Sequence, residues 1–452
     1  MPLPFVGPTY SLRSVVADIQ RTVGMIPTPL EPGNERTQWV FNDCPGLVEF
    51  SNLAGEVRGL WRVDSRVFAV AGNTAYELSA DGASVALFTM GSSVGLVGMT
   101  NNNDQLIVSD GEYMYIMKLS DNTMQQVFFP GKARIDYLNQ RVVFVHRDSQ
   151  VFGWTDLGAA EDIGALSFAS AEASPDKLTA LVVNHLEVFL FGTETGEPWN
   201  NVTGETIFER NTGGVFEVGS PAEFSAQKMD GTIYWLSSDR TGDGAVYRLQ
   251  GYMPQKISTV ALEQLLAGKD LANATAYSYT DERSWFYVLT VPGLDTTWVY
   301  DSFSGQWHER AEWIDGNYKP YRGTTHLMAF GYHLIGAKDG KVYRMDHNAH
   351  TNAGDILIRE RIMPTDAMPN RTRGHYRTFH LDCERGSGGT VMMRYSINGG
   401  RSWTAWKHRS LGELGVYNRS VKWDRLAAGK DYVFHVRCTD NVPFNPVNGG
   451  AE

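Results

Sequence analysis

The chain has 452 residues with a net charge of −11, and 12% of the residues are aromatic, 46 are glycine and three are cysteine. Cys44, Cys383 and Cys438 are too few and too scattered for a disulfide framework or a metal cluster. No apolar run reaches the ~18 residues of a membrane-spanning helix, and no basic stretch followed by an apolar core marks a signal peptide. The sequence therefore predicts a soluble protein of a reducing compartment, and it leaves the pairing of Cys383 with Cys438 open.

Residues 1–39 form the first region along the chain. They contain Pro2, Pro4, Pro8, Pro27, Pro29 and Pro32 around one short amphipathic stretch at Ser14–Val23. This short stretch cannot complete a propeller blade by itself. We predict an N-terminal arm that docks on another surface.

A phrase then recurs in which an apolar run meets a Gly, Asp or Asn turn and continues as an aromatic and aliphatic strand. Its aromatic markers are Tyr76, Tyr115, Phe152, Trp199, Tyr247, Tyr300 and Tyr343. Successive markers are 39, 37, 47, 48, 53 and 43 residues apart. This spacing is typical of the blades of a β-propeller, so we predict an all-β fold with a propeller of six or seven blades at residues 40–348.

Helix is scarce in the sequence. The best candidate is Ser258–Leu266, with Ser258 or Thr259 as the N-cap and Gly268 as the stop. A linker at 347–354 ends the predicted propeller, and residues 349–452 follow as a separate region. Alternating strands at 378–383, 391–396 and 432–438, separated by Gly-rich turns, predict a C-terminal β-sandwich-like domain there.

Motifs with chemical meaning are weak. Ser396–Trp403 resembles the Asp-box hairpin of sialidase-like propellers, with Asn398 in place of Asp, but that box is a structural turn. Asp239–Gly244 has closely spaced carboxylates and glycines but lacks the alternating acidic positions and distal Glu of a Ca²⁺ loop, so a plain turn is favoured. His308, His347 and His350 have no spaced partner for zinc and are interpreted as surface or turn residues.

These absences predict a protein that is not an enzyme, with no catalytic, cofactor-binding or metal-binding residues and no cofactor. Two alternatives stay open at this point. A carbohydrate-active propeller would need paired carboxylates at its channel, and a peptide-binding propeller would act as a monomer through one face.

Charge is divided unevenly along the chain. Residues 351–452 contain 15 Lys and Arg and 10 Asp and Glu, a net of +5, which leaves −16 on residues 1–350. A protein that grips DNA would cluster Lys and Arg to neutralise phosphates. We therefore expect the propeller to repel DNA and the basic C-terminal region to face acidic protein neighbours. The alternatives are that this region faces the channel, or that the charge serves solubility alone.

The order of several short phrases is more specific than any one of them. These phrases are Cys44–Leu47, Phe191–Glu194, Glu197–Trp199, Gly204–Glu205, Phe208–Arg210, Val246–Arg248, Gly251–Tyr252, Lys256–Thr259, Leu262–Glu263, Thr297–Asp301 and Gln306–Arg310. From Cys44 to about Arg361, their succession resembles the packaged-DNA stabilisation proteins of short-tailed bacteriophages, also called tail nozzle or tail hub proteins. Cys44 stands where the family pattern has Thr.

The resemblance implies a structural virion protein located in the tail and assembled in the cytoplasm of the bacterial host. It implies a homo-hexamer, a six-membered ring below the portal and its adaptor (head-to-tail connector) protein, which continues the DNA channel and retains the packaged genome. Double-stranded DNA would pass without specific binding, no small-molecule substrate is expected, and tail fibres or tailspikes and a tail needle or plug are further candidate partners. Glu197, Trp199, Trp298, Asp301, Trp307 and Arg310 are then expected as core aromatics and hairpin-locking polar residues, not as a ligand site.

Overall fold

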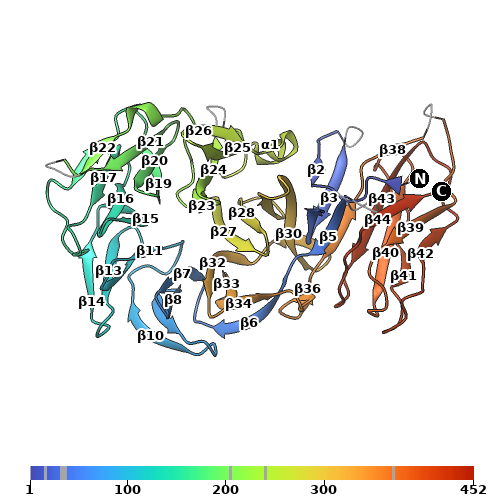
Figure 1. Ribbon diagram of the computed structural model, residues 1–452, viewed down its shortest axis with the longest axis horizontal. Coiled ribbons are helices and arrows are strands. Elements are labelled where there is room, and N and C mark those ends of the chain that lie inside the picture. Colours follow the sequence, from blue (N-terminus) through green and yellow to red (C-terminus); the bar gives the residue numbers. More distant parts are fainter. Residues whose placement is uncertain (1, 15–17, 31–37, 203–205, 239–241, 369–371) are drawn as a thin grey trace.

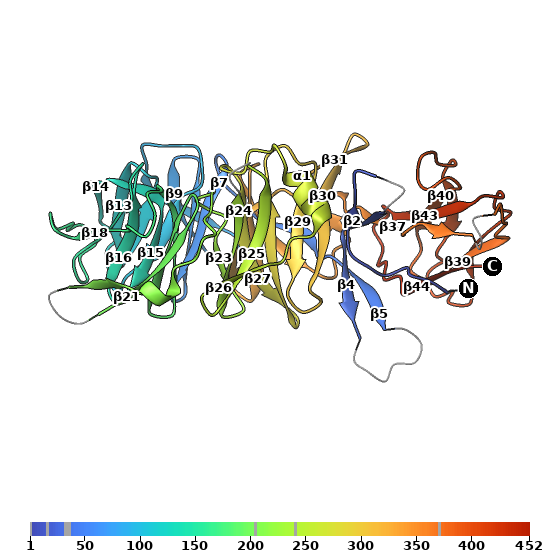
Figure 2. The same cartoon turned by 90° about the horizontal axis from the view of Figure 1, so that it is seen from above.

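The computed structural model describes residues 2–14, 18–30, 38–202, 206–238, 242–368 and 372–452. Nearly all elements in these residues are β-strands, and the helical ones are α1 (Val260–Leu266) and the 3-10 turn η1 (Thr212–Gly214). The molecule is elongated. A ring of sheets occupies one end and a two-sheet unit, with both chain ends, occupies the other (Figures 1 and 2).

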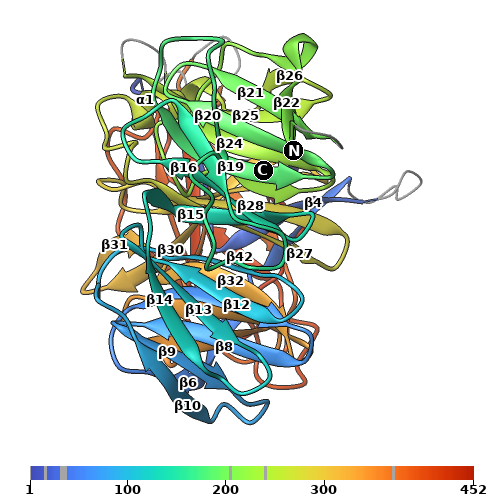
Figure 3. The same cartoon turned by 90° about the vertical axis from the view of Figure 1, so that its left-hand side faces the viewer.

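Within the described residues, seven antiparallel units of four strands are arranged radially as propeller blades; five are separate sheets, and those of blades 6 and 7 are parts of larger sheets (Figure 1). Figure 3 views the propeller from the end opposite the two-sheet unit. Blades 1 to 3 consist of β7 (Val57–Val63), β8 (Arg66–Ala71), β9 (Thr74–Leu78) and β10 (Ser84–Thr89); β11 (Gly98–Asn101), β12 (Gln105–Ser109), β13 (Tyr113–Lys118) and β14 (Met124–Phe128); β15 (Gly131–Leu138), β16 (Arg141–His146), β17 (Val151–Trp154) and β18 (Phe168–Ser170). Blades 4 and 5 consist of β19 (Leu178–Asn184), β20 (Glu187–Gly192), β21 (Gly196–Asn201) and β22 (Phe208–Arg210); β23 (Gln227–Met229), β24 (Thr232–Ser238), β25 (Gly244–Gln250) and β26 (Met253–Lys256). Blades 6 and 7 consist of β27 (Thr275–Asp281), β28 (Ser284–Thr290), β29 (Thr297–Asp301) and β30 (Gln306–Ile314); β32 (Gly323–Ala329), β33 (Tyr332–Ala337), β34 (Lys341–Asp346) and β6 (Gly46–Asn52).

The aromatic markers of the repeat all lie on the third strand from the axis of their blade. They are Tyr76 on β9, Tyr115 on β13, Phe152 on β17, Trp199 on β21, Tyr247 on β25, Tyr300 on β29 and Tyr343 on β34. The predicted propeller is thereby confirmed, and the number of blades is seven.

The blades pack face to face, with an apolar cluster between each neighbouring pair. Strand β8 shows why its sequence is an uninterrupted apolar run. Phe68 and Val70 point toward blade 2, while Val67, Ala69 and Ala71 point toward blade 7. Because side chains alternate along a strand, a strand covered on both faces needs apolar residues at every position.

The first two strands of six blades are joined by two-residue turns. In each turn the first residue is left-handed, with φ between 47° and 55°, at Asp64, Asn139, His185, Asp230, Glu282 and Phe330. Positive φ at this position belongs to the hairpin turns whose twist matches that of the flanking strands. These six blades therefore share the backbone conformation of this turn, although the side chain at its first position varies among Asp, Asn, His, Glu and Phe.

Ring closure uses two distant parts of the chain. Strand β6 precedes blade 1 in sequence but pairs antiparallel with β34, with Leu47 opposite Met345. The first strands β7 and β32 are neighbours, so blades 1 and 7 complete the circle. Blade 7 is thus held together by both ends of the propeller segment.

The two-sheet unit at the other end is a β-sandwich. One sheet orders β1 (Pro2–Leu3), β44 (Asn448–Ala451), β39 (Thr378–Asp382) and β42 (Val421–Asp424), and the other orders β37 (Arg359–Ile362), β43 (Asp431–Cys438), β40 (Thr390–Ser396) and β41 (Lys407–Ser410). Phe379 and Phe434 stack between the sheets with ring centroids 4.5 Å apart. Small elements complete the unit and its surroundings: β38 (Asp366–Ala367) beside β43, β31 (Asn317–Pro320) beside β30, and the pair β35 (Thr351–Asn352) and β36 (Asp355–Ile356) beside β6.

The described residues of the N-terminal region pack against other parts of the same chain. Strand β3 (Ile19–Val23), with β2 (Tyr10–Ser11) at its side, runs between β30 of blade 6 and β37 of the sandwich. The hairpin of β4 (Met25–Pro29) and β5 (Trp39–Asp43) projects beyond one face of the propeller (Figure 2). One sheet therefore continues from blade 6 through β3 into the sandwich. The division into 1–39, 40–348 and 349–452 stays a prediction.

Strand pairing in the predicted arm is possible because the prolines of its described residues lie at strand ends, in edge strands or between strands, while Pro32 lies outside the described residues. The predicted helix is confirmed as α1: the Thr259 hydroxyl accepts a hydrogen bond from the Leu262 N–H, and Gly268 follows the helix with φ of 72°.

Candidate functional site: the channel mouth and the propeller–sandwich joint

The six residues expected as blade framework lie in blades 4 and 6 and are largely or fully buried: Glu197, Trp199, Trp298, Asp301, Trp307 and Arg310. Glu197 accepts hydrogen bonds from the Ala173 backbone N–H at 2.7 Å and from Trp199 Nε1 at 3.2 Å. It thereby fastens the connection that precedes blade 4 to β21.

The framework residues of blade 6 act in the same way. Trp298 and Trp307 lie in the apolar cluster between blades 5 and 6, and Trp307 Nε1 donates to the Ile257 carbonyl at 2.8 Å. Asp301 accepts the Phe303 backbone N–H at 2.9 Å and so closes the turn after β29. These contacts fix the blades and leave no free carboxylate facing a ligand.

Arg310 is the exception among the six because it is a buried cation with no carboxylate partner. Its guanidinium lies 5.3 Å from the ring centroid of Tyr279 and 5.8 Å from that of Tyr321, and it donates to the Tyr279 hydroxyl. Its Nε and Nη1 have no partner, nor do the Tyr321 hydroxyl and Asn352 Oδ1, and these residues line a cavity of about 10 Å³. A polar cavity of this size holds about one water molecule.

The mouth of the central channel is a cavity of about 740 Å³. Residues at or just before the first strands of six blades line it: Glu56, Leu96, Ala133, Phe224, Ala274 and Arg322. Its ionisable groups have both signs, and Glu223, whose pKa is raised by burial, already accepts the Arg134 N–H at 2.6 Å.

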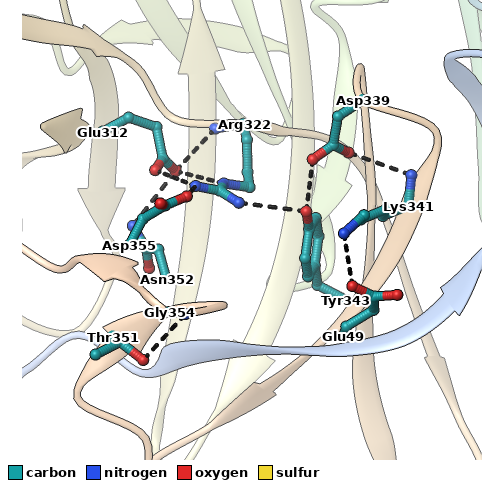
Figure 4. A network of polar contacts seen from close by, with 10 residues as sticks. All are labelled: Glu49, Glu312, Arg322, Asp339, Lys341, Tyr343, Thr351, Asn352, Gly354 and Asp355. Carbon is teal, nitrogen blue, oxygen red and sulfur yellow. Dashed lines mark hydrogen bonds and ion pairs between the residues drawn. The ribbon is translucent and has the colours of Figure 1, made fainter. Parts of the chain in front are cut away.

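Polar contacts beside this mouth tie blades 6 and 7 together (Figure 4). Arg322 forms ion pairs with Glu312 on β30 and Asp355 on β36, each at 2.7 Å, and also donates to the Tyr343 hydroxyl at 3.2 Å. Tyr343 in turn donates to Asp339 at 2.5 Å; burial, followed by this hydrogen bond, raises the pKa of Tyr343 to about 12. Arg322 therefore acts as a structural clamp and is not available to an incoming anion.

A second contact in Figure 4 supports ring closure. Lys341 Nζ on β34 lies 2.6 Å from Glu49 on β6, across the pairing that joins the two ends of the propeller segment. The pair is partly exposed, so solvent screens it and it contributes little to stability.

The joint between the propeller and the sandwich is built around arginines. Arg21 on β3 pairs with Glu309 on β30 at 2.7 Å. Arg361 on β37 is buried without a carboxylate partner, and burial lowers the pKa of Arg361 to about 9. Its guanidinium donates instead to five oxygens of the N-terminal segment: the carbonyls of Phe5, Gly7 and Pro8, the Thr22 hydroxyl and Gln20 Oε1. Arg361 therefore holds the N-terminal segment against the sandwich.

A buried acid lies next to these arginines. Glu360 accepts from Arg437 Nε and the Tyr318 hydroxyl, each at 2.6 Å, and lies 3.1 Å from His435 Nε2. Burial alone would raise the pKa of Glu360, but His435, Arg437 and Arg21 hold it well below its usual range. The carboxylate is thus fully used in the joint.

Next to Glu360, the guanidinium groups of two arginines and the indole rings of three tryptophans alternate in one stack, which we name the ladder. Arg437 lies 4.6 Å from the Trp313 ring centroid and 4.7 Å from that of Trp406, and Arg394 lies 4.6 Å from Trp406 and 4.9 Å from Trp403. The stack runs from β30 of blade 6 to the sandwich. Stacked guanidinium and indole groups attract one another through cation–π contacts, so the ladder stiffens the joint.

Sequence reasoning missed this ladder and the role of Arg361. The ladder's members come from residues 313, 394–406 and 437, which become neighbours only through sheet order. The spacing of Trp403 and Trp406 was the one local signal. Trp403 also ends the Asp-box-like turn, where Asn398 Oδ1 accepts the Ser402 N–H at 3.0 Å and Ser396 Oγ accepts the Gly400 N–H at 2.9 Å.

Histidine positions differ from the expectation in one case. His308 was expected at the surface or in a turn, but it lies fully buried in β30, because this blade packs against neighbours on both faces. His347 is half exposed and pairs with Asp281 at 2.9 Å, and His350 lies 3.7 Å from Asp43. Among the residues described, no three His, Cys, Asp or Glu side chains are grouped as metal ligands.

Other candidate positions carry no site. Residues 239–241 of the Ca²⁺-like turn, and Gly204 and Glu205 of the ordered phrases, lie outside the described residues. Cys44, Cys383 and Cys438 are buried free thiols, and Cys383 and Cys438 belong to the same sandwich core. No helix of the described residues is long and apolar enough to cross a membrane.

Comparison with known proteins gives one family. The family model described as bacteriophage P22 Gp10, β-propeller, matches residues 20–350, which include most of β3 and all seven blades. No curated protein matches the chain.

Solved structures resemble the chain only loosely. The Pan2 WD40 domain of Neurospora crassa is 8% identical, with 67% of this chain and 95% of that chain covered and a TM-score of 0.44. The N-terminal domain of Nup159 is 11% identical, with coverages of 72% and 98% and a TM-score of 0.43. Similarities of this size carry no information on function.

Proposed function

The chain belongs to the phage stabilisation family of bacteriophage P22 Gp10, a family of phage structural β-propellers, and from this membership we propose that it forms the tail nozzle or hub of a short-tailed phage. The observation that carries the proposal is the family match over residues 20–350. The match covers the whole propeller together with most of the strand that connects it to the sandwich.

In this proposal six copies form a ring below the portal and its adaptor. The ring continues the DNA channel and retains the packaged genome, while tail fibres, spikes or a needle attach to it. The continuous sheet and the arginine–tryptophan contacts between propeller and sandwich support such a role, because a subunit that bears the pressure of packaged DNA needs domains that do not swing. The genome would pass through the lumen of the ring formed by the six copies.

No catalytic step is part of the proposed role. The carboxylates of Glu223, Glu312 and Glu360 are engaged by a backbone N–H group, by arginines or by a tyrosine hydroxyl. The protein would act by shape and attachment.

Reconstitution tests the proposal. Purified protein is mixed with a portal–adaptor complex of a short-tailed phage and imaged by negative stain. A ring of added density at the open end of the adaptor is expected. Complexes that keep the outline of the portal and adaptor alone, with the protein free in the background, would contradict the proposed role.

A further inference from the structure

The two ends of the long molecule carry exposed apolar side chains in oppositely charged surroundings. One end consists of the outer strands of blades 2 and 3, and the other is the far end of the sandwich (Figures 1 and 2). Residues 98–177, which form blades 2 and 3, contain 11 Asp and Glu and 6 Lys and Arg, a net of −5. Residues 372–452 of the sandwich contain 12 Lys and Arg and 7 Asp and Glu, a net of +5.

The propeller end presents what we name the rim, defined by Met124, Phe128, Leu157, Leu166 and Phe168 with Asp121, Asp156 and Asp162. Phe128 is 66% exposed and Leu166 is 87% exposed. Strand β14 within the rim is an outer edge strand, Met124–Phe128, that contains no charged residue and no proline. Exposed edge strands normally carry such protection against pairing, so its absence indicates a surface that is covered in use.

The sandwich end presents what we name the tip, defined by Leu414, Val416 and Tyr417 with Arg409, Arg419, Lys422 and Arg425. Leu414 is 87% exposed and Tyr417 is 71% exposed. Tyrosine and arginine, both present at the tip, are among the residue types that dominate binding energy in protein interfaces.

The tip is held in place before any contact. The backbone N–H groups of Gly386 and Gly388 donate to the carbonyls of Leu411 and Gly412 at 2.9 and 3.0 Å, and the Gly415 N–H donates to the Gly386 carbonyl at 3.0 Å. These hydrogen bonds tie the loop between β41 and β42 to a neighbouring loop. A loop that is already ordered loses less entropy when it binds.

We propose that the tip of one copy docks on the rim of a second copy of this chain. A second copy is the proposed partner because the charges are complementary: the rim is acidic and apolar, and the tip is basic and apolar. The two surfaces lie at opposite ends of the molecule and are different, so the contact is head-to-tail and closes into a ring when the rotation between copies allows. The inference rests on the proposed function for the ring and adds the surfaces that form it.

The first experiment uses sedimentation velocity of the full-length chain from about 1 to 500 µM, a range suited to weak contacts. The wild type is expected to associate with rising concentration, less so in high salt. A tip variant (Leu414→Asp with Tyr417→Asp) and a rim variant (Phe128→Asp with Leu166→Asp) are each expected to weaken association at least ~10-fold. Met253→Asp, at an exposed position on blade 5, is the matched control and should behave as wild type.

The second experiment mixes the two variants in equal amounts. The tip variant keeps an intact rim and the rim variant keeps an intact tip, so the mixture should form heterodimers and nothing larger. A mixture that stays monomeric like its components, or either variant associating as strongly as wild type, would overturn the head-to-tail contact. A wild type that is monomeric over the whole range would do the same.

The outcome is separable from that of the proposed function. If the variants still form six-membered rings on the portal–adaptor complex, the tail role stands and the tip–rim contact is wrong. If wild-type copies associate through tip and rim but never attach to the adaptor complex, the contact stands and the tail role fails.

Discussion

His308 on β30 is a fully buried imidazole, and neither of its ring nitrogens has a hydrogen-bond partner. Burial lowers the pKa of His308 well below its ordinary value of about 6.5 and lowers the pKa of His326 to about 3. A folded pKa below the unfolded pKa means that the unfolded chain binds more protons as pH falls. These groups therefore contribute their full stability above pH ~6.5 and lose it as pH falls below that value.

The first prediction is that His308→Leu reduces the acid sensitivity of the protein. Each buried neutral histidine lowers the free energy of unfolding by up to about 1.4 kcal/mol for each pH unit below pH ~6.5. The variant lacks one such histidine, so it should lose less stability between pH 7.5 and 5 than wild type. Urea midpoints at the two pH values measure this. His408→Leu, at an exposed histidine, is the control, and an unchanged pH response in the His308 variant would refute the explanation.

The second prediction concerns Arg361, which donates to five oxygens of the N-terminal segment. Arg361→Met leaves these buried acceptors without donors, at a cost of about 3 kcal/mol or more. Limited proteolysis should cut residues 2–23 quickly in the variant and slowly in wild type, and Arg361→Lys should rescue little because a lysine cannot span the same acceptors. Equal protection of wild type and Arg361→Met would show that strand pairing alone holds the segment.

Among structural elements, β6 closes the ring because it joins blade 7 from the opposite end of the propeller segment. The third prediction is that Val48→Pro in β6 removes a ladder N–H and lowers stability by on the order of 3 kcal/mol. Faster hydrogen exchange in both β7 and β32 should accompany the loss. Val127→Pro in β14, also an outer strand, is the matched control, and its effect should stay within blade 2. If exchange in β7 and β32 is unchanged by Val48→Pro, β6 is not the closure.

The repeating strands were predictable from sequence, whereas the connecting ones were not. Markers such as Tyr115 and Tyr300 reveal blades because each blade repeats a local pattern of strand and turn. Strand β6 pairs with a segment about 300 residues away, and β3 pairs with strands from two different regions, so no local pattern reveals them. The framework role of Glu197 and Trp307 followed from their phrases, while the ladder of Arg394 and Arg437 depends on the final sheet order.

At the scale of the whole molecule, the net −16 on residues 1–350 opposes DNA binding. The fourth prediction is that isolated protein does not shift linear duplex DNA in a gel at micromolar concentration and about 0.15 M salt, where charge screening acts over ~8 Å. The net charge of +5 on residues 351–452 works against this prediction, because a basic region attracts DNA. Binding at micromolar concentration that weakens steeply with added salt would show that the basic region binds DNA. The expectation that DNA passes through the ring without specific binding would then be wrong.

The central claim is that this chain forms a closed ring in a phage tail, and the mass of the reconstituted complex tests it most directly. Portal–adaptor complex is saturated with the protein, purified and measured by native mass spectrometry. We predict a gain equal to six chains of 50.3 kDa for each portal ring. A gain corresponding to any other number of chains, or no gain, would contradict the claim.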